Sequence, residues 1–118
     1  MTQTTKIGWK EYEQMVFQLS REIRRSKIEF DGIYGVPRGG LVLAVCLSHK
    51  LDLPLKFKPT VNTLISEDIS DFGKTLLKYR RHKIVCLYSS KWTMVKPTWF
   101  IGMKRNKDDW IRFPWENE

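Results

Sequence analysis

The clearest chemistry in this chain lies in residues 62–76, where an acidic pair is followed by a loop of small and polar residues. Glu67 and Asp68 come directly after a short apolar run, and Gly73 and Thr75 follow within the loop. Carboxylates in this position can accept hydrogen bonds from the hydroxyl groups of a sugar. Backbone N–H groups of such a loop, at the beginning of a helix, can hold a phosphate group. The pattern therefore predicts a binding site for a phosphorylated sugar.

A second turn that bears glycine occurs upstream, in the segment Gly35-Val36-Pro37-Arg38-Gly39-Gly40. Its glycines permit a close approach of the backbone to a ligand. Taken alone, this segment is equally a plain connection between a strand and a helix. Two anion-binding turns that each follow a strand, however, predict a substrate with phosphate at both ends.

The elements that must position these two turns follow from the spacing of apolar residues. Apolar residues at every third or fourth position predict helices, and short runs that are apolar throughout predict buried strands. The expected helices span residues 9–26, 39–50 and 73–81, and the expected strands span residues 30–36, 55–57, 63–66 and 84–88. Such an alternation indicates an α/β fold with a parallel sheet covered on both faces. Ligands of these sheets bind beyond the carboxyl ends of the strands, where both turns lie.

The composition is that of one globular domain. The 118 residues are 42% hydrophobic and 29% charged, and no run approaches the roughly 18 apolar residues of a membrane span. The N-terminus has no apolar core like that of a signal peptide, so we expect no membrane contact and a cytoplasmic location. Cys46 and Cys86 lie in apolar runs without a CxxC pattern, and we expect two reduced core thiols.

The net charge is +8, from 21 Lys and Arg residues against 13 Asp and Glu residues. Basic residues gather in segments 21–27, 78–83 and 104–107. Such a surface attracts polyanions in general, but the first two segments fall near predicted helix ends, where cations favour the helix dipole. We therefore expect a solvated basic surface that steers a small anionic substrate, with nucleic acid as the lesser alternative.

The residues Gly73-Lys74-Thr75 look like the end of a nucleoside-triphosphate loop. That motif needs a glycine five residues before Gly73, and Asp68 stands there instead. A carboxylate in that place would repel a triphosphate, so we reject this interpretation.

Residues 64–75 resemble the signature loop of the type I phosphoribosyltransferases, which bind 5-phosphoribosyl-1-pyrophosphate (PRPP). Glu67 and Asp68 match the acidic pair of that motif, and three of its loop positions are matched by Asp71, Gly73 and Thr75. The resemblance implies that the acidic pair accepts hydrogen bonds from the ribose hydroxyls and holds an Mg²⁺ cofactor. It also implies that the loop wraps the 5′-phosphate of PRPP, through Ser70, Asp71, Phe72, Gly73, Lys74 and Thr75. In the purine-specific branch, the position of Asp71 lies near N7 of the base and assists its proton transfer.

The turn at residues 35–40 is similar to the pyrophosphate loop of the purine phosphoribosyltransferases. By this resemblance, Arg38 contacts pyrophosphate and offsets its charge, and Gly39 lets the backbone come close. The family often holds the peptide bond before this basic residue in the cis form. We therefore expect a cis bond between Pro37 and Arg38.

The segment from Asp109 to Glu116 is similar to the C-terminal hood of the xanthine-guanine phosphoribosyltransferases, which ends in a Trp-Ile-x-x-Pro-Trp pattern. Trp110 corresponds to the aromatic residue that stacks on the purine, and Ile111 to the residue whose backbone meets the 2-substituent of the ring. Lys91 matches the lysine that reads the 6-oxo group, which favours hypoxanthine, guanine or xanthine over adenine. We expect residues from about 91 to 118 to form the hood.

Together these resemblances imply the three-layer type I phosphoribosyltransferase fold, with a mostly parallel central sheet, helices on both faces and a small hood, in a single domain over residues 1–118. The implied function is transfer of the 5-phosphoribosyl group from PRPP to a 6-oxopurine, with release of pyrophosphate, in purine salvage. Mg²⁺ is the implied cofactor, and because the family commonly forms dimers or tetramers we expect a homo-oligomer. The alternative is a non-catalytic regulatory module of the same fold that binds PRPP or a nucleotide.

The chain departs from the family pattern at two places. Phe72 replaces a threonine of the phosphate loop, and the loss of one hydrogen bond to a charged group costs about 1.5–3 kcal/mol. Residues 56–62 are too short for the flexible loop that family members close over PRPP, a closure that excludes water. The replacement by Phe72 predicts weaker phosphate binding. The short segment predicts one of three alternatives: a slow enzyme, a lid supplied by a partner subunit, or a protein that binds without catalysis.

Overall fold

A four-stranded parallel sheet forms the centre of the molecule in the computed structural model, which describes residues 3–116. Its strands lie side by side in the order β2 (Gly32–Gly35), β3 (Thr63–Ser70), β4 (Ile84–Ser90) and β5 (Gly102–Lys104). The two central strands are almost wholly buried, which is why runs of apolar residues predicted them. The parallel α/β fold that we expected is confirmed.

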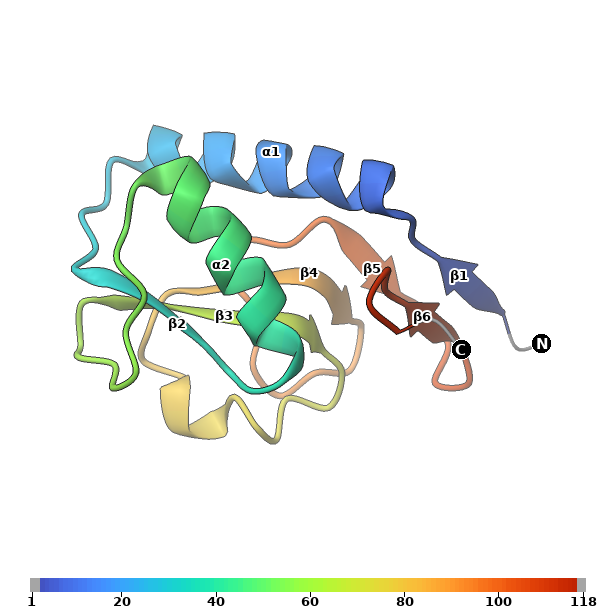
Figure 1. Ribbon diagram of the computed structural model, residues 1–118. Helices are drawn as coiled ribbons and strands as arrows, with labels where there is room; N and C mark the ends of the chain where they lie inside the picture. The colour runs from blue at the N-terminus through green and yellow to red at the C-terminus, as the bar shows by residue number, and fades with distance from the viewer. Residues whose placement is uncertain (1–2, 117–118) are drawn as a thin grey trace.

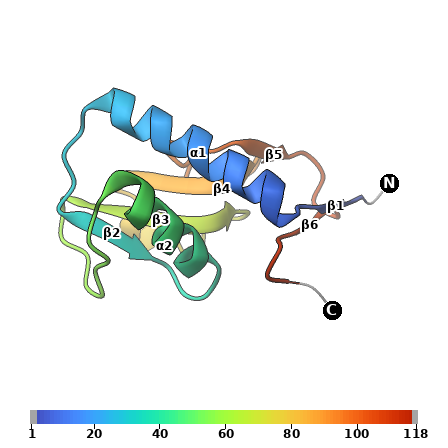
Figure 2. The ribbon, with the colours of Figure 1, turned by 45° about the horizontal axis from the view of Figure 1, so that its top comes forward.

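Helices α1 (Trp9–Ser26) and α2 (Gly39–Leu51) cover one face of this sheet (Figure 1). α1 runs over β4, whereas α2 packs on β2 and β3 (Figure 2). α1 buries a stripe of residues spaced three or four positions apart, as the sequence predicted, and its members are Tyr12, Val16, Leu19 and Ile23. This stripe and the inner side of α2 enclose the larger of two cores.

The opposite face carries a smaller core beneath η1 (Leu77–Tyr79), a single 3-10 turn. We expected a helix over residues 73–81, and that prediction was wrong. From this segment only Leu76 and Tyr79 reach the core, and their spacing of three positions suits the repeat of a 3-10 helix. An α-helix of that length with only two apolar anchors has too little packing to be stable. The third layer of the fold is therefore thin.

The segment between α2 and β3 stays at the amino end of the sheet. The predicted strand at residues 55–57 is reduced to a single bridge between Leu55 and Ile33. The chain then turns back, and the N–H of Asp31 donates to the carbonyl of Asn62 (3.1 Å) just before β3 begins. Residues 56–62 thus lie at the end of β3 opposite to the acidic pair, and they do not cover it (Figure 1).

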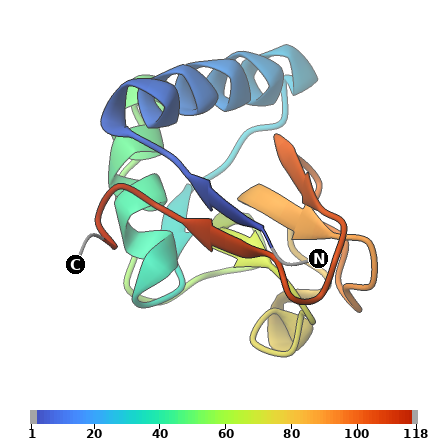
Figure 3. The ribbon, with the colours of Figure 1, turned by 90° about the vertical axis from the view of Figure 1, so that its right-hand side faces the viewer.

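The C-terminal segment contributes to two sheets. β5 lies beside β4 in the main sheet, whereas β6 (Trp110–Arg112) pairs in parallel with β1 (Thr4–Lys6). Figures 1 and 3 show that this pair lies beyond the carboxyl ends of the main strands. The Trp115 ring packs it against α1, because its centroid lies 5.2 Å from that of Tyr12 and 5.0 Å from that of Phe113. Of the segment predicted as the hood, residues 117–118 lie outside the described residues.

Two further observations bear on the expectations from composition. None of the helices within residues 3–116 is long and apolar enough to cross a membrane. Cys46 and Cys86 are free thiols, half-buried and buried respectively, as predicted.

Candidate functional site

The acidic pair and the upstream glycine turn meet at the carboxyl end of β3. The strand continues four residues beyond its predicted end, so Glu67 and Asp68 lie inside it, past the last residue that pairs with β2. A Cβ atom on Gly39 would overlap the Asp68 carboxylate, and one on Gly40 would overlap the carbonyl of Ser66. Only glycine can stand there, since any side chain would push the turn off the acids. The structure also confirms the expected cis bond between Pro37 and Arg38.

The two carboxyls lie in a poorly solvated place. Glu67 is 8% exposed, and one of its oxygens accepts a hydrogen bond from the Asp68 N–H (3.0 Å). Burial, and after it the charge of Asp68, raises the pKa of Glu67 well above its ordinary value. Burial also raises the pKa of Asp68, although its carboxylate accepts a hydrogen bond from the Ile69 N–H (2.7 Å). A bound cation, or hydroxyl groups of a ligand, would stabilise both charges.

The donor set at this point fits Mg²⁺ better than a metal held by protein alone. Within residues 3–116 no group of three or more His, Cys, Asp and Glu side chains could hold a metal ion. Glu67 and Asp68 offer hard oxygen donors, and Mg²⁺ usually takes one or two carboxylates and completes its shell with water and phosphate oxygens. The acidic pair therefore suits an Mg²⁺ ion that arrives with a phosphorylated substrate.

The loop after β3 presents unused backbone donors. Gly73 has a φ of 84°, a conformation that favours glycine. Within the described residues, the N–H groups of residues 72–75 donate to no partner. Consecutive N–H groups in such a turn form a concave site for an anion. Lys74 and Thr75 are exposed beside it, and Phe72 exposes 50% of its surface.

A second loop, at residues 92–95, packs against the loop at residues 71–75 and holds it in place. The Ser70 hydroxyl lies 2.7 Å from the hydroxyl of Thr93 and donates to the carbonyl of Val95 (2.9 Å). The Met94 N–H donates to the carbonyl of Phe72 (3.0 Å). The buried side chain of Ser70 thus serves the packing of the loop, so this residue can offer a ligand only its backbone. Sequence reasoning did not find Thr93, because a lone threonine between basic and apolar residues gives no signal.

Asp71 is held by two side chains that sequence reasoning also missed. One carboxylate oxygen accepts a hydrogen bond from Nε1 of Trp92 (3.1 Å), and the other accepts one from Nζ of Lys104 (2.9 Å). We expected segment 104–107 to be solvated surface, but Lys104 is only 7% exposed, so that expectation was wrong for this residue. Lys104 ends β5, which lies beside β4 and brings the ammonium to the end of the loop. The contact between Lys104 and Asp71 could not be predicted from the sequence, since the three residues of β5 are too few to show a periodic pattern.

The predicted cations Arg38 and Lys91 are both exposed. In the part of the chain that the structure describes, neither side chain makes a hydrogen bond or an ion pair. Arg38 caps the N-terminus of α2, and Lys91 directly follows β4. Both cations therefore stand at the carboxyl edge of the sheet and are free to meet a ligand.

The two predicted purine contacts of the hood lie on β6. Trp110 is 57% exposed, and Ile111 is half-buried against the larger core. No hydrogen bond, ion pair or ring contact within residues 3–116 joins either side chain to Asp71. A cavity of about 400 Å³ is nevertheless lined by both Ile111 and Lys104, which connects the hood with the neighbourhood of Asp71.

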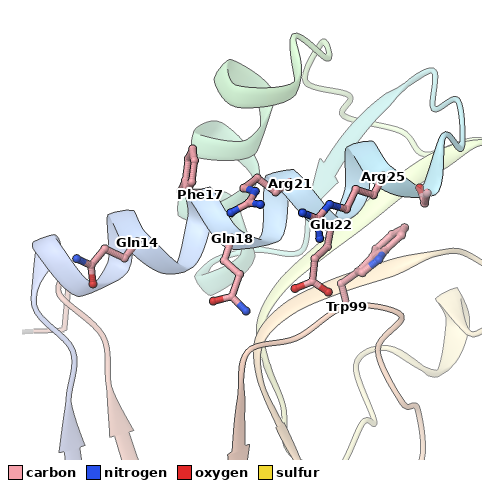
Figure 4. A pocket seen from close by; sticks show the side chains of 8 residues that line it. Gln14, Phe17, Gln18, Arg21, Glu22, Arg25 and Trp99 are labelled. Carbon is pink, nitrogen blue, oxygen red and sulfur yellow. The ribbon is translucent and has the colours of Figure 1, made fainter.

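A further groove of the described surface lies elsewhere. A groove of about 760 Å³ runs along the outer side of α1, as Figure 4 shows. Its lining side chains belong to Gln14, Phe17, Gln18, Arg21, Glu22, Arg25, Ser26 and Trp99. None of the predicted site residues lies in it. The candidate site is thus an open edge of the sheet and is separate from this groove.

The chain is similar over almost its whole length to solved phosphoribosyltransferase structures. It is 33% identical to the purine phosphoribosyltransferase from Pyrococcus horikoshii Ot3, with a TM-score of 0.81, and the match covers 98% of this chain and 95% of that one. It is 18% identical to the xanthine-guanine-hypoxanthine phosphoribosyltransferase of Helicobacter pylori, with a TM-score of 0.75 and coverage of 96% and 94%. A hypothetical protein from Neisseria gonorrhoeae with bound ppGpp matches at 14% identity, with a TM-score of 0.78 and coverage of 99% and 91%. No family model and no curated protein matches the chain.

The similarity to the Pyrococcus horikoshii protein decides the family. An identity of 33% over nearly all of both chains goes beyond a shared fold, whereas the two lower identities show the fold alone. The acidic pair, the glycine turn against it and the loop with unused N–H groups lie at the carboxyl edge of the sheet, where the pattern of strands and helices in the sequence predicted them. This chain belongs to the purine phosphoribosyltransferases of the type I fold.

Proposed function

We propose that this protein transfers the 5-phosphoribosyl group of PRPP to a 6-oxopurine and releases pyrophosphate. One observation carries the proposal: two loops suited to anions follow neighbouring strands, and the acidic pair lies between them. The turn at residues 35–40 touches Asp68, and the loop at residues 71–75 offers free N–H groups. This arrangement suits a ribose with phosphate groups at both ends.

Each part of PRPP has a partner at this edge. The ribose hydroxyls would donate to Glu67 and Asp68, whose raised pKa values reflect a need for such donors. The 5′-phosphate would lie on the N–H groups of residues 72–75, next to the exposed side chains of Lys74 and Thr75. Pyrophosphate would lie on the turn at residues 35–40, beside the exposed Arg38.

The reaction exchanges one bond at C1′ of the ribose. A purine ring nitrogen attacks C1′ while the bond from C1′ to the pyrophosphate oxygen breaks, and its electron pair leaves with pyrophosphate. Arg38 offsets the negative charge that develops on this leaving group. Asp71 accepts the proton that the purine loses.

Glu67 and Asp68 would also hold Mg²⁺. When bound, the ion supplies Lewis-acid stabilisation of the oxygens of pyrophosphate and ribose. Glu67 is buried and Asp68 is half-buried, and in the part of the chain that the structure describes neither has a cationic side chain in contact. They therefore provide the negative charge that this ion needs, and the substrate supplies the remaining ligands.

The purine would bind between the phosphate loop and the hood. The exposed ammonium of Lys91 can donate to a 6-oxo group, whereas the 6-amino group of adenine is itself a donor. Trp110 has a free ring face on which a purine can stack, and Ile111 beside it would meet the 2-substituent. These contacts support hypoxanthine, guanine or xanthine as the base.

The short segment at residues 56–62 is compatible with this activity. The match covers 95% of the protein named as the Pyrococcus horikoshii purine phosphoribosyltransferase, so a chain of nearly the same length bears that name. We therefore favour an enzyme that works without a long lid.

A homo-oligomer is part of the proposal. α2 is apolar around most of its circumference, yet Leu41 and Val45 on its outer side expose 44% and 42% of their surfaces. Helices that are apolar all round are usually buried. A second copy of the chain could cover this side, next to the turn at residues 35–40. Analytical ultracentrifugation should find a dimer or tetramer that Leu41→Glu dissociates, and a wild-type monomer would contradict this part.

The test of the proposed function is a product assay with each base. The protein, Mg²⁺ and PRPP are incubated with hypoxanthine, guanine, xanthine or adenine, and the nucleotide formed is separated and measured. We expect nucleotide with at least one 6-oxopurine, the least with adenine, and none without Mg²⁺. If no base gives product while calorimetry still shows PRPP binding, the non-catalytic alternative is correct.

A further inference from the structure

Lys104 is a buried cation at the edge of the proposed site. Its Nζ lies 2.9 Å from Oδ2 of Asp71 and 5.9 Å from the centre of the Trp92 ring. Only two ion pairs occur within the described residues, and the other joins Lys56 to Asp31. Asp71 is therefore the one carboxylate that compensates this ammonium.

The side chains of Asp71 and Lys104 differ in their exposure to solvent, and this difference indicates which of the two can contact a ligand. The side chain of Asp71 is 33% exposed, whereas that of Lys104 is 8% exposed. A ligand can thus reach the carboxylate more readily than the ammonium. Lys91 stays exposed nearby and is the lysine that can touch a base.

The carboxylate of Asp71 is fixed at both of its oxygens. Trp92 donates to Oδ1 (3.1 Å) and Lys104 donates to Oδ2 (2.9 Å), while the hydroxyl of Ser90 holds the backbone carbonyl of Asp71. Each carboxylate oxygen has a second lone pair, so Asp71 can still accept a hydrogen bond from a ligand. The cost of leaving a buried ammonium unpaired keeps the carboxylate in this place.

We propose that Lys104, together with Trp92, is a positioning residue that orients the Asp71 carboxylate toward the purine. This inference rests on the proposed function, in which Asp71 accepts the purine proton. Neither Lys104 nor Trp92 touches substrate. Both act through Asp71, since a carboxylate that turns freely would spend most of its time out of reach of the purine.

The experiment is a double-mutant cycle on nucleotide formation. Lys104→Met removes the ammonium and keeps the length of the side chain, and Asp71→Asn removes the acceptor of the proton. We expect Lys104→Met to lower kcat by roughly 10- to 100-fold, with the KM for PRPP changed by less than about 2-fold. In the Asp71→Asn background, Lys104→Met should lower kcat no further, because a positioning residue has no effect once its target is lost. Effects that multiply, or an unchanged kcat in Lys104→Met, would overturn the proposal.

Two further variants keep this test independent of folding. Trp92→Phe retains the ring and removes only Nε1–H, so it should reproduce part of the loss in kcat even if Lys104→Met is unstable. Lys107→Met removes an exposed lysine from the following loop and should leave kcat unchanged. The NMR signal of the Trp92 indole N–H should move in both Asp71→Asn and Lys104→Met. A wild-type protein that forms no nucleotide overturns the proposed function and the role of Lys104 in it. If the wild type forms nucleotide, but the two substitutions multiply in their effects or Lys104→Met leaves kcat unchanged, only the role of Lys104 is overturned.

Discussion

Glu67 is buried and Asp68 is half-buried, and neither carboxyl has a cationic side chain in contact among the residues that the structure describes. Such a pair lowers the stability of the free protein, since at neutral pH the folded state must either take up a proton that the unfolded chain has released or hold charge that water would solvate better. The same deficit would give the proposed site its affinity for a cation and for hydroxyl donors. At this scale stability and binding oppose one another, as is usual at functional sites.

The variant Glu67→Gln tests this opposition through the pH dependence of stability. The pKa of Glu67 is higher in the folded protein than in the unfolded chain, where it lies at the ordinary value of a Glu side chain, near pH 4–5. The proton bound by the folded state stabilises the fold at and below this ordinary pKa, and the stabilisation is lost as pH rises into the neutral range. The wild-type free energy of unfolding should therefore fall over that interval, and Glu67→Gln should fall less. At pH 7 the variant should be the more stable by about 1–3 kcal/mol. Urea denaturation between pH 4.5 and 8 measures the difference.

Glu29→Gln is the matched control for that measurement, because Glu29 is exposed. Its stability should follow the wild-type curve within about 0.5 kcal/mol. A Glu67→Gln curve that stays parallel to the wild-type curve would show that Glu67 does not titrate in this way.

Gly39 gives a second prediction for a single residue. Gly39→Ala would force its Cβ into the Asp68 carboxylate, so the turn at residues 35–40 must move away from the acids. We expect a loss of stability of about 1–3 kcal/mol from overpacking and a clear loss of PRPP affinity. Thermal denaturation and calorimetry measure the two effects. Gly8→Ala is the control, since its Cβ would meet only the flexible end of Glu11, 3.2 Å away, and an equal loss in both variants would contradict the account.

Among the elements, the loop at residues 71–75 depends on the loop at residues 92–95. Thr93 and Val95 hold Ser70, and they leave no room for a Cβ on Gly73, with 2.6 Å to the Thr93 hydroxyl. The phosphate loop is therefore preformed, and its free N–H groups need little ordering when a phosphate binds. Phe72 stands in this loop where the family has a hydroxyl, and its ring lies 6.4 Å from that of Trp92.

Phe72→Thr should restore the missing donor. One additional hydrogen bond to a charged phosphate is worth about 1.5–3 kcal/mol, so PRPP should bind roughly 10-fold more tightly or better. Calorimetry at fixed Mg²⁺ measures the affinity. Phe72→Val has a similar shape without the hydroxyl, and it should bind like the wild type. If both variants gain equally, the ring of Phe72 obstructs the site and the hydroxyl is not the cause.

The elements also show what the sequence could and could not predict. α1, α2, β3 and β4 were predicted, because each buries a periodic or continuous apolar surface. The helix at residues 73–81 was not found in the structure, since two apolar anchors do not decide between a helix and a turn. Lys104 and Trp92 could not be assigned to Asp71 from the sequence, because that contact depends on a three-residue strand beside β4. The position of the motif residues at the edge of the sheet could be predicted from the sequence, whereas the residues that contact and orient them could not.

At the scale of the whole molecule, charge and architecture serve the same edge of the sheet. The net charge of +8 would attract the proposed substrate PRPP, and the pair of β1 and β6 lies beyond the strand ends where the purine would bind (Figure 3). The Trp115 ring joins that pair to α1. Segments near both ends of the described chain, β1 and β6, therefore lie beside the proposed site. Residues 56–62 are too short to add a long lid.

The dependence on salt follows from this charge. Screening shortens the range of the attraction, so the KM for PRPP should rise roughly 3- to 10-fold between 0.05 and 0.5 M salt. The KM for the uncharged purine should change by less than about 2-fold under the same conditions. Steady-state kinetics at several salt concentrations compare the two, and a parallel rise of both KM values would point to a general effect of salt on the fold.

The central claim is that the carboxyl edge of this sheet carries out phosphoribosyl transfer, and phosphorus NMR tests it most directly. The spectrum of PRPP with Mg²⁺ and hypoxanthine, guanine or xanthine is followed over time with wild-type protein and with Asp68→Asn. We predict that the PRPP signals are replaced by those of pyrophosphate and a nucleoside monophosphate in equal amounts, and that Asp68→Asn slows this at least 10-fold. PRPP that stays intact with every 6-oxopurine, or that is hydrolysed without forming nucleotide, would contradict the claim.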